Sequence, residues 1–157
     1  MKKDFFDYMY KVMAENKDVF FVFIDLGFPR VDEFLEKYPD RTINCGASEA
    51  TACDIAVGLS YAKKIPVLYT ITPFYWRAAE TIRTYLDYEK LPCLLVGVGV
   101  KEEYGEDGFS HSGTDAPKLF NLFKNFKQFY PDTPNELISN LNEAIISNKP
   151  NFLNLHR

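Results

Sequence analysis

The 157-residue sequence lacks the features of a secreted, membrane-spanning or zinc-stabilised protein. It has only three cysteines, an odd number, and no two of them form a CxxC pair. No apolar stretch is long enough to cross a bilayer, and the first residues mix charged and aromatic side chains, unlike the apolar segment of a signal peptide. We therefore expect a reduced, cytoplasmic protein with no structural zinc and no metal site of its own. The cysteines are Cys45, Cys53 and Cys93.

A strong imbalance of charge is also missing. The formal net charge is -4, so the sequence has no basic excess of the kind that binds nucleic acid or an anionic membrane, and we expect neither partner. Aromatic residues, in contrast, are abundant, with fourteen Phe and ten Tyr. We expect some of them to face a partner chain. The length is that of one ordinary domain, so we expect a single domain over residues 1–157.

Apolar runs typical of buried strands alternate along the chain with segments of helical periodicity. The strand-like runs cover residues 19–24, 42–44, 65–71, 92–99, 127–130 and 152–155. The helical segments cover 4–17, 31–38, 48–63, 76–88 and 116–125, and a last one begins at 133. Continuous apolar strands that alternate with helices predict an α/β fold, with a mainly parallel sheet and helices on both of its faces.

The most informative stretch is residues 44–59, which predicts the start of a helix. Gly46 provides a turn, Ser48 is a favourable N-cap residue, and Glu49 follows in the first helical turn. The next residues are small enough for close packing against a neighbouring layer, so we expect the Glu49 carboxylate to be buried and to require a partner. The alternative is that Glu49 only caps its helix, where the helix dipole favours an acid.

Polar and aromatic residues follow several of the predicted strands. They occupy positions 25–27, 45–49, 72–77 and 104–113, and they include carboxylates, an arginine, three adjacent aromatics and one of only two histidines. In parallel sheets, ligands bind beyond the carboxyl ends of the strands. Because nothing similar gathers at the opposite ends, we expect a functional site at this edge.

Three of these segments resemble, in order and spacing, the pyrimidine-binding domain of transketolase and deoxyxylulose-phosphate synthase. The segments are Gly46-Ala47-Ser48-Glu49, Phe74-x-x-Arg77-Ala78 and Gly105-Glu106-Asp107-Gly108-Phe109-Ser110-His111. The resemblance covers nearly the whole chain. It has two departures, since Ala50 stands where the family usually has Gln or His, and Phe109-Ser110 where it usually has Pro-Thr.

The resemblance implies thiamine diphosphate as the cofactor. In this family the carboxylate at the position of Glu49 hydrogen-bonds a ring nitrogen of the aminopyrimidine and shares its proton, which promotes formation of the nucleophilic ylid that attacks a ketose carbonyl. The resemblance also places Ser48 and Phe74 at the cofactor, Phe74 by stacking on the pyrimidine. The alternative for Phe74 is a core aromatic at the end of a strand.

The resemblance implies substrate contacts as well. Asp107 and His111 match positions that bind the hydroxyls and carbonyl of the sugar, and His111 is thereby a second catalytic candidate. Arg77 matches an arginine that binds substrate phosphate. The alternatives are a solvated histidine and a surface arginine. Asp25 is either a further substrate contact or a turn cap, and Arg157 either reaches this edge or lies in a frayed terminus.

Two parts of such enzymes are missing from the sequence. It has no Gly-Asp-Gly motif with a following Asn, which holds Mg²⁺ and the diphosphate in this family, and no carboxyl-terminal transketolase domain. The resemblance therefore implies a subunit of a split transketolase-like enzyme in carbohydrate metabolism, which transfers two-carbon ketol units between sugars or sugar phosphates. A companion chain in a hetero-oligomer would hold Mg²⁺. The alternatives are a subunit of a two-chain 2-oxo acid decarboxylase and a non-catalytic relative.

Overall fold

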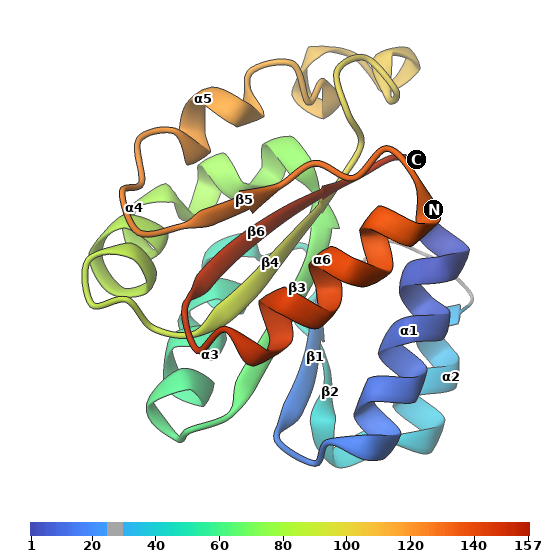
Figure 1. Ribbon diagram of the computed structural model, residues 1–157. Helices are drawn as coiled ribbons and strands as arrows, with labels where there is room; N and C mark the ends of the chain where they lie inside the picture. Colours follow the sequence, from blue (N-terminus) through green and yellow to red (C-terminus); the bar gives the residue numbers. More distant parts are fainter. Residues whose placement is uncertain (25–29) are drawn as a thin grey trace.

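The computed structural model describes residues 1–24 and 30–157, which form a parallel sheet between two layers of helices (Figure 1). The strands are β1 (Val19–Phe23), β2 (Thr42–Asn44), β3 (Ile65–Ile71), β4 (Cys93–Val98), β5 (Lys127–Phe129) and β6 (Pro150–Leu155). They form a six-stranded sheet in the order β2-β1-β3-β4-β6-β5. Every pairing between these strands is parallel, which confirms the predicted fold class.

Helices connect the strands. The α-helices are α1 (Lys2–Glu15), α2 (Arg30–Lys37), α3 (Glu49–Tyr61), α4 (Ala79–Thr81), α5 (Ala116–Phe120) and α6 (Pro134–Ile146). Shorter 3₁₀ segments are η1 (Pro39–Arg41), η2 (Thr72–Ala78), η4 (Gly105–Asp107) and η5 (Phe109–His111), and η3 (Ile82–Asp87) is a π-helix. No helix among the described residues is long and apolar enough to cross a membrane.

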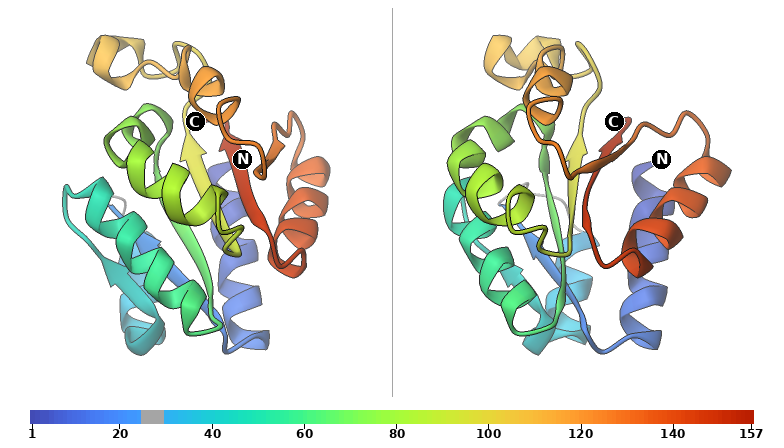
Figure 2. Two further views of the ribbon diagram at one scale, coloured as in Figure 1. Left: turned by 90° about the vertical axis from the view of Figure 1, so that its left-hand side faces the viewer. Right: turned by 60° about the vertical axis from the view of Figure 1, so that its left-hand side comes forward.

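The two faces of the sheet carry separate apolar layers (Figure 2). Successive side chains of a strand point to opposite faces. Phe21 accordingly belongs to the layer that contains side chains of α1, α2 and α6, whereas Val22 belongs to the layer that contains side chains of α3, η3 and α5. Much of the aromatic content lies in these layers; for example, the Phe5 and Tyr69 rings stack with their centroids 5.2 Å apart. The sheet is therefore buried on both sides, as its continuous apolar strands predict.

The predicted helix over 76–88 is wrong in its details, because contacts with the sheet override helical periodicity. The chain instead forms η2, α4 and η3 in succession. Tyr75 is fully buried in η2, and its hydroxyl lies 3.3 Å from the carbonyl oxygen of Leu68 and 3.1 Å from that of Val96. These contacts fix η2 against β3 and β4.

The predicted helix over 116–125 is shorter than expected. It ends at Phe120, after which the side chains of Phe123 and Phe126 turn into the apolar layer. The buried Asp87 carboxylate accepts hydrogen bonds from the backbone N–H groups of Lys124, at 3.2 Å, and Asn125, at 2.7 Å. These bonds satisfy backbone groups that a longer helix would have paired internally.

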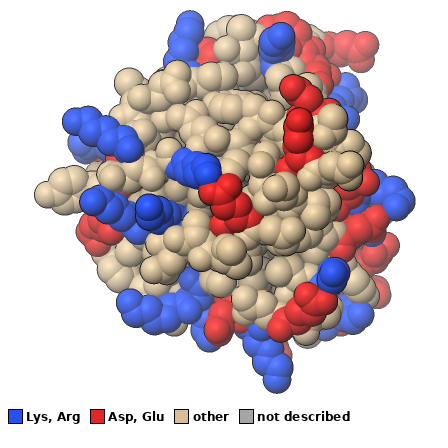
Figure 3. Space-filling view, in the orientation of Figure 1, with Lys and Arg blue, Asp and Glu red and all other residues tan. Residues whose placement is uncertain are grey.

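Three of the segments that were predicted to carry the site, 45–49, 72–77 and 104–113, gather at the carboxyl ends of the strands, while 25–27 lies outside the described residues. The segment with η4 and η5 lies over this edge, and η5 contacts η2 (Figure 2). On the face that α6 covers, acidic and basic side chains are interspersed (Figure 3).

Candidate active site

The chain turns sharply from β2 into α3. The Asn44 side-chain oxygen accepts a hydrogen bond from the Gly46 N–H at 2.9 Å, and Gly46 has a φ of +60°, a left-handed conformation that glycine adopts without strain. Ser48 occupies the N-cap position as predicted, but its hydroxyl does not cap the helix; it donates to the Thr51 hydroxyl at 2.7 Å. The capping part of the prediction is therefore wrong. Glu49 begins the helix, as expected.

The Glu49 carboxylate is buried, with 5% of the residue exposed. Its partner is Arg77, whose guanidinium NH1 donates to Glu49 Oε1 at 2.8 Å. The Arg77 side chain is 56% exposed, so one end of the ion pair lies inside the protein and the other reaches solvent. An unpaired carboxylate at this depth would be costly, and Arg77 meets the predicted need for a partner.

Phe74 lies beside this ion pair. The Arg77 guanidinium stands 4.5 Å from the centroid of the Phe74 ring, and the His111 ring approaches the same ring edge-on, with centroids 5.1 Å apart. Phe74 is partly exposed and belongs to neither apolar layer, which argues against the core alternative. Contacts thus join Glu49, Arg77, Phe74 and His111 into one cluster from three separate segments.

Two further predicted residues do not join this cluster. Asp107 is exposed on η4, and its carboxylate makes no hydrogen bond or ion pair with the rest of the described chain. Asp25 lies outside the described residues.

His111 is partly buried, and its Nδ1 lies 3.0 Å from the Ser110 hydroxyl. The alternative of a freely solvated histidine is therefore wrong.

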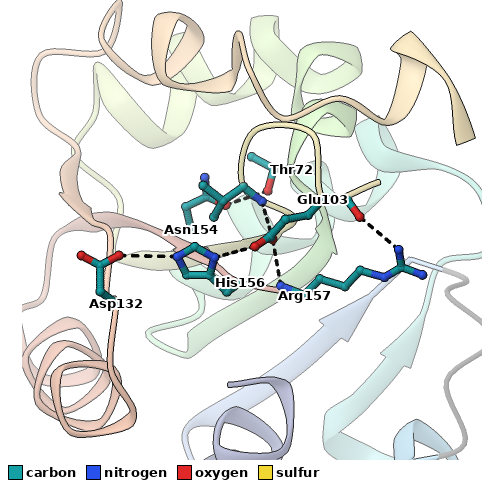
Figure 4. A network of polar contacts seen from close by, with 7 residues as sticks. Thr72, Glu103, Asp132, Asn154, His156 and Arg157 are labelled. Carbon is teal, nitrogen blue, oxygen red and sulfur yellow. Dashed lines mark hydrogen bonds and ion pairs between the residues drawn. The ribbon is translucent and has the colours of Figure 1, made fainter. Parts of the chain in front are cut away.

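A second polar network lies at the same edge of the sheet, centred on Glu103 (Figure 4). His156 Nδ1 lies 2.6 Å from Glu103 Oε1, and the backbone N–H groups of Val100 and Arg157 donate to Oε2 at 2.8 and 2.9 Å. On its other side, His156 Nε2 lies 3.5 Å from Asp132 Oδ1. Burial raises the pKa of Glu103, but the hydrogen bonds outweigh it and hold the pKa below its usual value.

Arg157 takes part in this network, so the alternative of a frayed terminus is wrong. Its guanidinium NH1 donates to the Glu103 carbonyl at 3.0 Å and lies over the Tyr104 ring. The sequence interpretation missed Glu103 and His156. Their positions in the sequence could have indicated them, because His156 directly follows the last strand and Glu103 lies in the loop after β4. Both therefore lie beyond the carboxyl ends of strands, where ligands bind in parallel sheets.

A comparison with protein families agrees with this geometry. The sequence pattern of a family described as the pyrimidine binding domain of transketolase matches residues 1–157. The chain belongs to this family. The predicted resemblance is confirmed, and the sheet described above is the fold of a transketolase pyrimidine-binding domain.

This pyrimidine-binding domain is similar to parts of longer curated proteins. It is 28% identical over 127 residues to an apulose-4-phosphate transketolase subunit of Actinobacillus succinogenes, covering 80% of this chain and 41% of that protein. It is 29% identical over 105 residues to 1-deoxy-D-xylulose-5-phosphate synthase of Fusobacterium nucleatum, covering 67% of this chain and 17% of that protein. The chain thus spans less than half the length of these relatives.

Solved structures share the fold of the domain. A split gene transketolase, described as an inactive beta4 tetramer, matches 99% of this chain and 51% of its own, with a TM-score of 0.86 and 23% identity. The transketolase from Campylobacter jejuni matches 98% of this chain and 25% of its own, with a TM-score of 0.87 and 18% identity.

Proposed function

We propose that this pyrimidine-binding domain acts as one subunit of a split, thiamine diphosphate-dependent transketolase-like enzyme. The enzyme transfers a two-carbon ketol unit between sugars or sugar phosphates. The observation that carries the proposal is the buried carboxylate of Glu49 at the start of α3, which is linked through the Arg77 guanidinium to the partly exposed ring of Phe74.

The residues present fit the aminopyrimidine half of the cofactor. An aminopyrimidine is a flat ring with a ring nitrogen, so it requires an aromatic face and a group that shares a proton. The Arg77 guanidinium is also flat, and it contacts both the Glu49 carboxylate and the Phe74 ring. The two side chains therefore accommodate one planar group between them.

Each residue of the cluster then has a chemical role. When bound, thiamine diphosphate supplies a thiazolium carbon that acts as a carbanion equivalent. Glu49 holds and shares a proton at the pyrimidine ring nitrogen, and its burial keeps water from competing for that bond. Phe74 orients the pyrimidine by stacking, and Ser48 lies next to Glu49 as a further cofactor contact.

We assign the loop with η4 and η5, at the carboxyl ends of the strands, to binding of the sugar substrate. His111 can donate and accept hydrogen bonds at neutral pH, which suits a sugar carbonyl or hydroxyl. The exposed Asp107 carboxylate is free to accept from a sugar hydroxyl. We assign both residues to substrate binding, with Asp25 as a further candidate and Arg77 as a candidate for a substrate phosphate.

A companion chain completes the proposed site. We assign Mg²⁺ and the diphosphate to that chain. Two similar proteins support this arrangement by their names, since one is named as a subunit of a transketolase and the other as a split gene transketolase.

Co-expression with the product of the neighbouring gene tests the proposal. The complex is purified through a tag on this chain, and thiamine diphosphate with Mg²⁺ is titrated by calorimetry. We expect saturable binding by the complex and weak or no binding by the chain alone. A complex that binds no cofactor would point to a non-catalytic relative.

The variant Glu49→Gln tests the role of the carboxylate, because it keeps the size of the side chain and replaces the acid by an amide. An amide cannot share the proton, so we expect intact assembly and a loss of ketol transfer of about 10²- to 10⁴-fold. Gel filtration checks the assembly and a ketose-donor assay checks the activity. Unchanged activity in this variant would defeat the proposed role of Glu49.

A further inference from the structure

The Arg77 guanidinium makes the two contacts that the proposed function assigns to the aminopyrimidine. Its NH1 donates to Glu49 Oε1 at 2.8 Å, and its central carbon stands 4.5 Å from the Phe74 ring centroid. We propose that Arg77 occupies the pyrimidine position in the cofactor-free chain and leaves it when the cofactor binds. This inference rests on the proposed function and adds an internal competitor to it.

The two groups cannot share the position, because both are flat and both use the same atoms. Stacked groups cover the face of an aromatic ring, and the guanidinium already covers one face of Phe74. The His111 ring lies against the same ring at an interplanar angle of 71°. Because the guanidinium covers Phe74 while it contacts Glu49, an aminopyrimidine that stacks on this face and reaches Glu49 has to take its place.

Burial determines which side chain moves. The Glu49 side chain is 6% exposed and begins α3, so it is held in place, whereas the Arg77 side chain is 56% exposed and can rotate into solvent. Once Arg77 has left, Glu49 would take up one proton from solvent and share it with the ring nitrogen of the pyrimidine, which has no hydrogen of its own to donate. The buried carboxylate thus has a partner in both states, which avoids the cost of an isolated buried charge.

Only a chain in which Arg77 is displaced can bind the pyrimidine. The apparent dissociation constant is therefore the intrinsic one divided by the fraction of chains in that state. The probe is 4-amino-5-hydroxymethyl-2-methylpyrimidine, which carries the aminopyrimidine and no diphosphate, and NMR titration measures its dissociation constant for the full chain. We expect Arg77→Ala to bind it about tenfold more tightly than the unmodified chain, which corresponds to a displaced fraction of about one tenth. Arg83→Ala removes an exposed arginine of η3 and should leave the affinity unchanged.

A second readout needs no variant of the site. The Nε–Hε signal of Arg77 in the unmodified chain should shift when the pyrimidine saturates, while that of Arg83 stays in place. If Arg77→Ala binds the pyrimidine equally or more weakly and the Arg77 signal does not move, Arg77 is no competitor. If Glu49→Gln then abolishes the binding of the pyrimidine to the chain, this loss still supports the proposed function. If neither the unmodified chain nor Arg77→Ala binds the pyrimidine, the inference is overturned, whereas the proposed function is decided separately by the binding of thiamine diphosphate to the co-purified complex.

Discussion

At the scale of single residues, the candidate site combines a buried acid with groups that solvent can reach. Glu49 is buried at the start of a helix, whereas Arg77 and Asp107 are exposed. This difference suits a site in which one acid keeps a fixed position while substrate enters from the solvent side. His111 is intermediate in burial, and its ring lies against Phe74.

The position of His111 predicts a selective effect of its removal. We expect His111→Ala to lower kcat/KM for the sugar substrate by about 10²-fold, because a hydrogen-bond partner of the sugar carbonyl or hydroxyl is lost, and to change the affinity for thiamine diphosphate much less. Steady-state kinetics and calorimetry on the complex measure the two quantities. Glu106→Gln, on the same exposed loop, is the control and should behave like the unmodified chain. Equal losses of turnover and cofactor affinity in His111→Ala would mean that His111 is structural.

At the scale of elements, the site depends on how closely η2 approaches the sheet. Thr72, the first residue of η2, donates its hydroxyl hydrogen to the buried Asn154 of β6 at 2.8 Å (Figure 4). Gly97 of β4 lies beneath it, and a Cβ added there would stand 2.7 Å from Thr72 Oγ1 and 3.0 Å from Thr72 Cα. The absence of a side chain at 97 therefore allows η2 to carry Phe74 and Arg77 to Glu49.

This close approach predicts that Gly97→Ala destabilises the domain by about 1–3 kcal/mol, because the added methyl group overpacks the contact between β4 and η2. Denaturant unfolding measures the change in the free energy of unfolding. The control is Gly58→Ala in α3, where a Cβ meets nothing within 4 Å. That variant should stabilise the domain by about 0.5–1 kcal/mol, because alanine is the better helix former. A Gly97→Ala variant as stable as the original would show that η2 can shift freely.

At the scale of the whole molecule, the Glu103 network joins the ends of the chain to the carboxyl edge of the sheet. Glu103 follows β4, while His156 and Arg157 follow β6. The neighbouring Tyr104 hydroxyl accepts a hydrogen bond from Lys2 Nζ at 2.9 Å, and Arg157 lies over the same ring. α1 and the end of β6 are thereby fixed to one loop, which also continues into η4 and η5.

The lowered pKa of Glu103 predicts a pH-dependent stability. The folded state holds the pKa below the usual 4.5, so ionised Glu103 stabilises the fold above that pH, and the contribution is lost as the pH falls through the folded pKa. We expect Glu103→Gln to lower the free energy of unfolding at pH 7 by about 1–3 kcal/mol. The difference from the original chain should shrink below about pH 4.5. Glu106→Gln removes one carboxylate from the same loop and is measured as the control. A difference that stays constant from pH 7 to pH 3 would contradict this role of Glu103.

The sequence by itself determined the fold class and the edge of the sheet at which the candidate site lies. Continuous apolar strands, as in 19–24, specify a sheet buried on both faces, and the alternation with helices specifies parallel pairing. The small residues after Glu49 predicted its burial, which the structure confirms. These features could be predicted because periodicity, residue size and burial are local properties of the chain.

Only the tertiary structure decided which side chains meet. The partner of Glu49 is Arg77, 28 positions away on a segment whose 3₁₀ and π geometry the helical pattern did not predict. The Glu103–His156 contact joins residues 53 positions apart. Such pairs depend on where two backbones approach and on which rotamers the packing allows, as the contact of Gly97 with Thr72 illustrates. Neither property is contained in a local pattern of residues.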